Sequence, residues 1–420
     1  MIRPAAHKIN QDHWGFYEIG PLRSYSKLEA IEISAKNKHP IRWNYNNQVF
    51  EQYDWTQEPP GTLEYWYRLR AQQLRDRYDY LVLLYSGGAD SHNMLMTFVS
   101  NNIFVDEIVQ MHSLEAYNGD RQAEPNAEIF ETSIPVTQAL IANHPLYKHT
   151  LHRVIDISKW QSTMFNIKAN KWDYFYNSST WQSPWSQCLG SIRSMEPAYE
   201  KLAEQGRNLC FVGGFDKPAI DIDQHNNFYF IIEDGGVHGY VQPRQQAENI
   251  SWHHTEQFYA TPDLPELSIK QAHTLKRFML GLNPQSVDGR YVKGGKFDRK
   301  KLDNQFHAWP AAQIMLDDHW YQLSKDGLHK LVYPHWISDS VVCPKPMSAY
   351  FGQKDLWLWD KMAPDLGQRR YQKSVVWLRD YVKKLDSSMW WEFPFDPGSG
   401  MPYQGGMKIL KNRYCLDRSA

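Results

Sequence analysis

The sequence contains little cysteine: only Cys188, Cys210, Cys343 and Cys415 in a chain of 420 residues. No two of them stand close enough for a C-x-x-C pair, which excludes a zinc ribbon and a thioredoxin-like redox pair. So few cysteines in so long a chain do not make a disulfide scaffold. We therefore expect a cytoplasmic protein whose thiols stay reduced.

Long hydrophobic runs and an excess of one charge are also missing. The apolar run from Tyr80 to Tyr85 is far shorter than the stretch of about twenty residues that a membrane helix needs, and the first residues contain no apolar signal core. The 46 Lys+Arg nearly balance the 47 Asp+Glu, which excludes a basic nucleic-acid coat protein and a charge-driven disordered chain. We expect a soluble protein with no membrane partner.

The composition is that of a folded chain, with 42% apolar and 14% aromatic residues. Its length allows two to four domains at roughly 100–200 residues each. We divide it into an N-terminal extension at residues 1–78, an α/β domain at 79–245, and a mainly helical C-terminal region at 246–420.

Strand-like and helix-like segments alternate through the predicted α/β domain. The continuous apolar run at residues 80–85 is typical of a strand that is buried on both faces, as in parallel sheets. Three further strands are expected, at residues 106–112, 151–157 and 208–212. Helices are expected between them, at residues 92–99, 126–144 with a kink at Pro135, and 184–205. This alternation predicts an α/β fold with a parallel sheet.

Further elements are expected outside this alternation. An amphipathic helix is expected at residues 62–77 of the extension, and a hairpin at 228–241 that turns at Asp234-Gly235-Gly236. The C-terminal region contains the patterns of two helices, at 264–282 and 371–385.

The loop after the first buried strand carries a motif with specific chemistry, Ser86-Gly87-Gly88-Ala89-Asp90-Ser91. The helix that follows offers unpaired N–H groups and the positive end of its dipole. Two glycines let a phosphate approach the backbone, two serine hydroxyls add donors, and Asp90 can hold a magnesium ion. A plain tight turn would not need all these residue types, so the motif predicts a phosphate site at the carboxyl end of a parallel strand.

The pattern S-G-G-x-D-S resembles the signature of the N-type ATP pyrophosphatases, the PP-loop family. The resemblance is specific over the loop, extends in the order of elements over roughly residues 79–220, and is nearest in layout to the synthetase domain of asparagine synthetase. It implies a Rossmann-like sheet of the HUP (adenine nucleotide alpha hydrolase-like) type with helices on both faces. It also implies ATP and Mg²⁺ as cofactors, and a reaction that forms AMP and pyrophosphate.

The resemblance assigns roles to residues of the loop and its neighbours. Asp90 would hold the magnesium ion, and the backbone around Leu84 and Tyr85 would face the adenosine. His112, at the end of the second strand, would meet the adenine, or it is a strand-end residue with no task. The pyrophosphate would be held by four loop residues, Ser86, Gly87, Gly88 and Ser91.

A second segment with a similar placement follows the fourth strand. It begins with Gly213 and Gly214 and resembles the G-x-G-x-D-E segment that closes on pyrophosphate and metal in asparagine synthetases. Asp216 matches that pattern as a metal ligand. Lys217 replaces the glutamate, and its charge would stabilise the leaving pyrophosphate. The alternative is a turn with a surface ion pair.

Other nucleotide-binding and catalytic motifs are missing from the sequence. The nearest imitation of a Walker loop begins with Gly289 and Gly294 and lacks the lysine and the Ser/Thr that the pattern requires. There is no G-x-S-x-G, no H-E-x-x-H and no helix-opening G-x-G-x-x-G.

These absences also indicate the branch of the family. Position 2 is Ile2 rather than the catalytic cysteine of a glutaminase domain, so the nitrogen donor would be ammonia or an amine. We expect a ligase that adenylates a carboxylate or carbonyl oxygen of a small-molecule acceptor and then forms a C–N bond. A net charge of −1 does not favour tRNA, so an enzyme that modifies a nucleobase or tRNA through the cations at 293–301 is the second hypothesis. A non-catalytic nucleotide-binding protein is the third.

Overall fold

The computed structural model describes residues 15–24, 27–112, 114, 129–158, 196–214, 219–222, 227–232, 253–281, 292–293, 296–297 and 410–417. The expected helix at 371–385 lies outside them, with most of the C-terminal region, so its mainly helical character stays a prediction. Among the described residues, no helix has both the length and the apolar character needed to cross a lipid bilayer.

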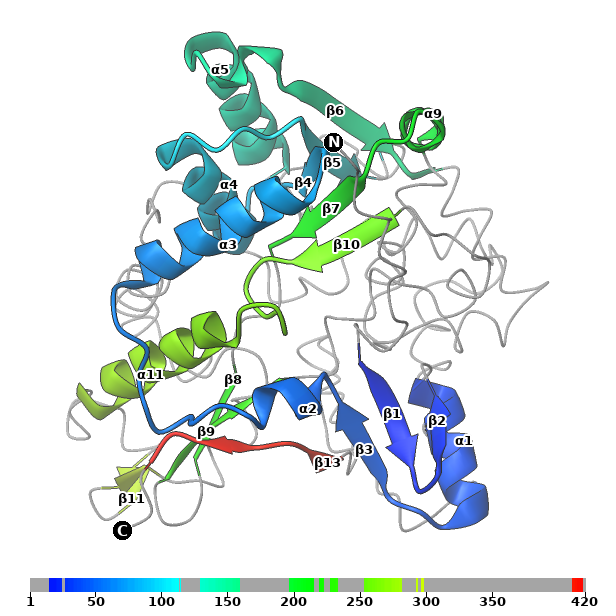
Figure 1. Cartoon of the computed structure of the whole chain (residues 1–420), viewed down its shortest axis with the longest axis vertical. Helices are drawn as coiled ribbons and strands as arrows, with labels where there is room; N and C mark the ends of the chain where they lie inside the picture. The colour runs from blue at the N-terminus through cyan, green and yellow to red at the C-terminus, as the bar shows by residue number, and fades with distance from the viewer. Residues whose placement is uncertain are drawn as a thin grey trace.

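Five parallel strands form the central sheet of the described chain, in the order β10-β7-β4-β5-β6 (Figure 1). The middle strand β4 is apolar because it is covered on both faces, and its Leu81, Val82 and Leu83 are fully buried. The sheet confirms the α/β, Rossmann-like architecture for this part of the chain. Four strands match the expected ones: β4 (Tyr80–Leu84), β5 (Glu107–His112), β6 (Leu151–Asp156) and β7 (Leu209–Gly213).

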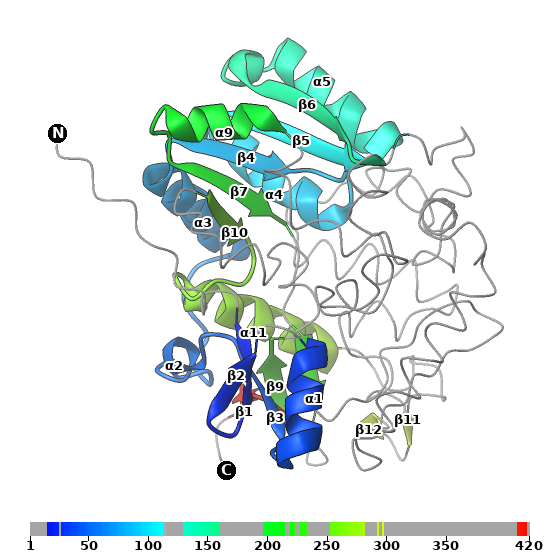
Figure 2. The same ribbon diagram turned by 90° about the vertical axis from the view of Figure 1, so that its right-hand side faces the viewer.

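Helices lie on both faces of this sheet: α4 (Ala89–Ser100), α5 (Ile134–Asn143) and α9 (Pro197–Glu204) (Figure 2). Successive residues of a strand point to opposite faces. Val109 of β5 packs in one cluster with Tyr199 of α9, whereas Gln110 donates a hydrogen bond to Thr137 of α5. The helices α9 and α5 therefore cover opposite faces of the sheet.

Two of the helices differ from the expected ones. The segment expected at 126–144 begins, in its described part, with a π-helix at Ile129–Ser133. This π-helix leads directly into α5, and Pro135 stands in the first turn of α5. The proline is tolerated there because that turn needs no donor from it. Of the helix expected at 184–205, the described part is α9. Gly206, with φ +77°, follows its end in the left-handed conformation that commonly terminates helices.

The sheet has a fifth strand that the sequence did not reveal. β10 (His253–Gln257) pairs in parallel with β7, so the sheet continues past residue 245, where the α/β domain was expected to end. Its sequence, H-H-T-E-Q, has no apolar run to mark it. The helix α11 (Pro265–Gly281) follows shortly after and matches the helix expected at 264–282.

Two smaller sheets lie on the other side of α11 from the parallel sheet (Figures 1 and 2). The first has the order β13-β3-β1-β2 and consists of β13 (Leu410–Lys411), β3 (Ile41–Asn44), β1 (Phe16–Ile19) and β2 (Leu22–Ser24). The second has the order β14-β9-β8 and consists of β14 (Tyr414–Cys415), β9 (Phe228–Ile231) and β8 (Ala219–Ile222). The remaining short elements are α1 (Lys27–Asn37), α2 (Asn47–Phe50), β11 (Val292–Lys293) and β12 (Lys296–Phe297).

The hairpin expected at 228–241 is wrong, because the strand β9 does not pair with the residues that directly follow it. The strand β9 pairs antiparallel with β8, which precedes it, and β14 occupies its other edge. The glycines at the expected turn lie outside the described residues. A strand of four residues does not reveal from its own sequence which neighbour it pairs with, because pairing depends on segments far away in the chain.

Residues from the beginning, the middle and the end of the chain meet around β14. Trp55 stacks on Phe230 and on Tyr414, with ring centroids 4.6 Å apart in each case. Asp417 accepts a hydrogen bond from Lys276 Nζ of α11 at 2.7 Å. Together with the pairing of β13 on β3, these contacts attach the segment at 410–417 to both small sheets and to α11.

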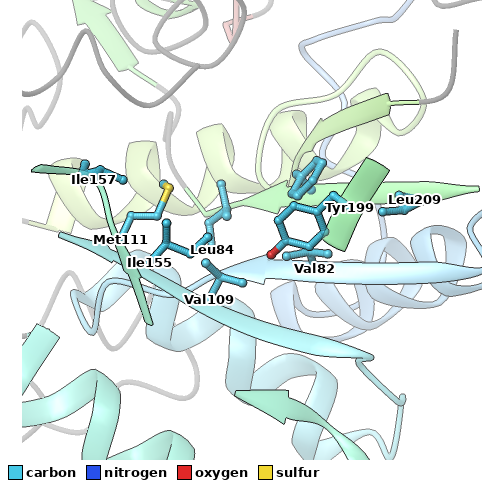
Figure 3. Close-up of a cluster of buried hydrophobic side chains, with 9 residues drawn as sticks. Val82, Leu84, Val109, Met111, Ile155, Ile157, Tyr199 and Leu209 are labelled. Carbon is cyan, nitrogen blue, oxygen red and sulfur yellow. The ribbon is translucent and has the colours of Figure 1, made fainter. Parts of the chain in front are cut away.

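A cluster of apolar side chains fills the space between α9 and the sheet (Figure 3). The Tyr199 ring lies edge-on to Phe211, with centroids 5.0 Å apart, and its hydroxyl donates to the fully buried Glu107 at 2.8 Å. Tyr80 and Arg153 also donate to this carboxylate, at 2.9 and 2.5 Å, so its burial is compensated. The other cluster members are Val82, Leu84, Val109, Met111, Ile155, Ile157 and Leu209.

A buried ion pair joins the helix α3 (Leu63–Arg77) to the edge strand β10. Arg70 is fully buried, and its Nη2 donates to Glu256 Oε2 at 2.9 Å and to the Gln257 carbonyl at 2.7 Å. Tyr78 donates to Glu256 Oε1 at 2.5 Å. One carboxylate therefore neutralises a buried guanidinium and fixes α3, the helix expected at 62–77, against the sheet.

Replacing this carboxylate should destabilise the fold strongly. We expect Glu256→Ala to lower the free energy of unfolding by about 3–5 kcal/mol, because it leaves a buried charge without compensation. The matched control is Arg277→Ala, which removes a side chain that is 54% exposed and pairs with Glu58, and which should cost less than about 1 kcal/mol. Urea unfolding of the three proteins measures the difference. If Glu256→Ala lowered the free energy of unfolding as little as Arg277→Ala does, the Arg70–Glu256 pair would not be needed for stability.

Candidate functional site

The predicted site lies where β4 and β7 are neighbours in the sheet. From β4 the chain proceeds to β5 and β6 on one side, and it returns to β7 and β10 on the other. The connections that leave the carboxyl ends of β4 and β7 therefore diverge. Open α/β sheets bind ligands at such a topological switch point.

The loop after β4 turns sharply into α4. Gly87 has a φ of +88°, a conformation in which a side chain would be strained. Gly88 is the N-cap of α4, with φ −71° and ψ 164°, and it provides no side-chain cap for the helix. Because the first N–H groups of a helix have no intrahelical acceptor, such an uncapped end suits an anion.

The two serines of the loop have different environments. Ser91 is buried, and its Oγ donates to the Gly88 carbonyl at 3.1 Å and accepts from the Ser86 amide at 3.2 Å. Ser86 is exposed, and its Oγ lies 3.1 Å from Ser91 Oγ. Ser91 therefore holds the loop closed, whereas Ser86 lies on the exposed side of the loop and its Oγ accepts a hydrogen bond from the Gly88 amide at 3.4 Å.

Tyr85 supports the loop from inside the protein. Its amide donates to the Val109 carbonyl at 2.9 Å, and its carbonyl accepts from Ser133 Oγ at 2.7 Å. Its hydroxyl shares a 2.9 Å hydrogen bond with His92 Nδ1 on α4, and burial raises the pKa of this phenol above its ordinary value. The side chains of Tyr85 and Leu84 are both buried, and the contact of their backbone with adenosine stays a prediction.

The second predicted segment meets the first. Gly213 is the register partner of Leu84, and a Cβ placed on Gly214 would come within 3.1 Å of Ser91 Cα and 3.2 Å of the Asp90 carbonyl oxygen. The absence of a side chain at Gly214 therefore lets the end of β7 pack directly on the first turn of α4. The other predicted residues of this segment, Asp216 and Lys217, lie outside the described part of the chain, and their roles stay predictions.

His112 ends β5, two strands away from β7 in the sheet order. Its side chain is fully buried and lies edge-on to Phe130, with ring centroids 5.1 Å apart. This placement puts the imidazole beneath the surface, inside the layer that the π-helix covers. Both hypotheses for His112, the contact with adenine and the strand-end residue with no task, stay predictions.

Sequence reasoning missed one residue that touches the loop. Tyr259 follows β10, and its hydroxyl donates to the Asp90 carbonyl at 2.6 Å and accepts from Asn93 Nδ2 at 3.0 Å. No local signal marks this tyrosine, because its proximity to the loop depends on β10, which was not recognised as a strand.

Asp90 is the predicted magnesium ligand of this site. The described residues contain no group of three or more His, Cys, Asp or Glu side chains that could enclose a metal ion. Magnesium is commonly held by one or two carboxylates together with the phosphates of a substrate. Asp90, in the acidic first turn of α4, is a suitable donor of this kind, and so the residues present fit a phosphate-bound Mg²⁺ ion.

Comparisons with known proteins add no assignment. No protein-family model matches the chain, and no curated protein matches it either. The site therefore rests on its own geometry: an uncapped helix start, a loop fixed by Ser91, and a glycine that packs against it.

The packing of Gly214 leads to a stability prediction. We expect Gly214→Ala to lower the free energy of unfolding by about 1–3 kcal/mol, because the new methyl group is too close to backbone atoms of α4 that have little room to move. Gly214→Val, with a larger side chain at the same place, should cost more. Thermal or urea unfolding measures both variants. A Gly214→Val protein as stable as the wild type would contradict the close approach of β7 to α4.

Proposed function

We propose that this protein is an ATP-dependent ligase of the PP-loop type, which cleaves ATP between the α- and β-phosphates. The observation that carries the proposal is the complete S-G-G-x-D-S loop at the switch point between β4 and β7, leading into an uncapped helix. The same observation supports assignment of the α/β part to the HUP class of nucleotide-binding folds. The cytoplasm is the compartment that suits such an enzyme.

The loop is suited to hold the β- and γ-phosphates of ATP. The amides of the first turn of α4 point toward the loop side, and the helix dipole favours negative charge there. Gly87 and Gly88 let phosphate oxygens approach the backbone, and Ser86 Oγ adds a donor from the exposed side of the loop. The arrangement binds anions through fixed dipoles and does not need a Walker lysine.

The proposed reaction has two steps. A carboxylate or carbonyl oxygen of the acceptor attacks the α-phosphorus of ATP, the bond to the β-phosphate oxygen breaks, and pyrophosphate leaves with that electron pair. Ammonia or an amine then attacks the adenylated carbon, AMP leaves, and a C–N bond is formed with loss of a proton. The loop contributes to the first step, because its donors stabilise charge that grows on the pyrophosphate.

Asp90 is the residue we assign to magnesium. When bound, the ion supplies positive charge that neutralises the phosphate oxygens. The chain contributes a carboxylate at a fixed place, since the Asp90 carbonyl is held by Tyr259 and the peptide after it is packed against Gly214. Asp216 is proposed as a second carboxylate and Lys217 as a cation near the leaving group.

The products formed from ATP test the proposal directly. Protein incubated with α-labelled ATP, Mg²⁺ and pools of carboxylates and amines should release labelled AMP together with pyrophosphate, and removal of Mg²⁺ should stop the reaction. Asp90→Asn, purified in parallel, should show neither product and thereby excludes a contaminating ATPase. Turnover that yields ADP and orthophosphate instead would contradict the proposal.

The two serines should respond differently to substitution. Ser86→Ala should lower kcat by about 100- to 1000-fold, because a donor to the leaving pyrophosphate is lost, and should weaken ATP binding only about tenfold. Its effect on unfolding should stay within about 0.5 kcal/mol, since the side chain is exposed. Ser91→Ala should lower both kcat and stability, the latter by about 1 kcal/mol, because its hydroxyl closes the loop.

AMP formation and thermal unfolding, measured on both serine variants, separate these effects. A Ser86→Ala protein that turns over at the wild-type rate, or that loses ATP binding and rate in equal proportion, would show that Ser86 contributes nothing specific to the reaction.

A further inference from the structure

Tyr259 connects the end of β10 to the start of α4. It follows β10 by two residues, and its hydroxyl donates to the carbonyl of Asp90 at 2.6 Å. The same hydroxyl accepts from Asn93 Nδ2 at 3.0 Å, so one phenol contacts two positions on the first turns of α4.

The phenol is itself held in place. Tyr259 is fully buried, and its ring lies edge-on to Tyr67 of α3, with centroids 5.5 Å apart, and to Phe258 at 5.1 Å. Burial raises the pKa of Tyr259 well above its ordinary value, so the hydroxyl stays protonated and remains a donor. Because the ring is fixed, the hydrogen bond from its hydroxyl restrains the peptide group whose carbonyl accepts that bond.

The restrained peptide group joins Asp90 to Ser91, two residues of the predicted site. The carbonyl of Asp90 and the amide of Ser91 belong to a single planar unit, and Gly214 packs against that same unit. Tilting this unit would change the direction of the Ser91 amide and move the Asp90 carboxylate. Geometry of this kind must be fixed before the reaction for the donors to stabilise growing charge.

We propose that Tyr259 is a positioning residue, which fixes the first turn of α4 and thereby the direction of its anion-facing amides and of the Asp90 carboxylate. The role of this alignment in turnover rests on the proposed function. The restraint on the first turn of α4 does not depend on that function and is measured separately.

The test compares two buried tyrosines with matched chemistry. Tyr259→Phe keeps the ring and removes the hydroxyl. Tyr147→Phe does the same at a buried tyrosine whose hydroxyl donates to the Ile103 carbonyl, also at 2.6 Å, away from the loop. Because phenylalanine fills almost the same volume, both variants should fold, with thermal midpoints lowered by a similar few degrees.

Hydrogen–deuterium exchange gives the first readout. Tyr259→Phe should speed exchange in peptides that cover the loop and the first turns of α4 by about tenfold or more, and Tyr147→Phe should leave these peptides unchanged. Exchange at wild-type rates in Tyr259→Phe would overturn the inference, whether or not the protein turns over ATP.

Kinetics of AMP formation give the second readout. Tyr259→Phe should lower kcat about tenfold or more with a smaller change in KM for ATP, and Tyr147→Phe should retain the wild-type kcat. Equal kcat losses in the two variants would reduce Tyr259 to a general structural role and overturn the inference. If the wild type forms no AMP, the proposed function fails, and hydrogen exchange alone decides whether Tyr259 restrains the helix.

Discussion

Burial of β4 on both faces is the constraint on which the rest of the described structure depends. A strand with apolar side chains on each side must have helices on each side, and the parallel connections that bring them there place its carboxyl end at the centre of one sheet edge. The loop that follows therefore emerges beside the ends of β5 and β7. The glycines and serines of the loop lie at this position because they directly follow an apolar strand in the middle of the sheet.

Two distant parts of the sequence contact a single peptide unit at the start of α4. Gly214 packs against the Asp90–Ser91 peptide from the end of β7, and Tyr259 donates to its carbonyl from the end of β10. The Ser91 hydroxyl closes the preceding loop through the Gly88 carbonyl and the Ser86 amide. Such convergence is typical of a site whose backbone, rather than a long side chain, recognises the ligand.

The sequence predicted those parts of the fold that local pattern determines. Four strands, the helix at 63–77 and the loop were found because an apolar run, a helical period or a glycine pair marks them. The strand β10 was missed because it lies at the edge of the sheet and its residues are polar, among them the Glu256 of the buried ion pair. The predicted pairing of β9 was wrong because the sequence of a short strand does not determine which strand it pairs with. Tyr259 was missed for the same reason, because its contact with Asp90 depends on the position of β10. The different burial of Ser86 and Ser91 could not be predicted, because it depends on how the loop folds.

The attachment of residues 410–417 affects the order in which the molecule can assemble. All five described strands of the parallel sheet are present once residue 257 has been synthesised, whereas β3 and β9 lack their described partners β13 and β14 until the end of the chain. Closing so large a loop costs only slightly more entropy than closing a short one, but the search for it is slow. During translation the nascent chain therefore lacks the partner of β3 from residue 44 onward and that of β9 from residue 231 onward, until residues 410–415 arrive, and a chaperone that covered these two edges would protect it.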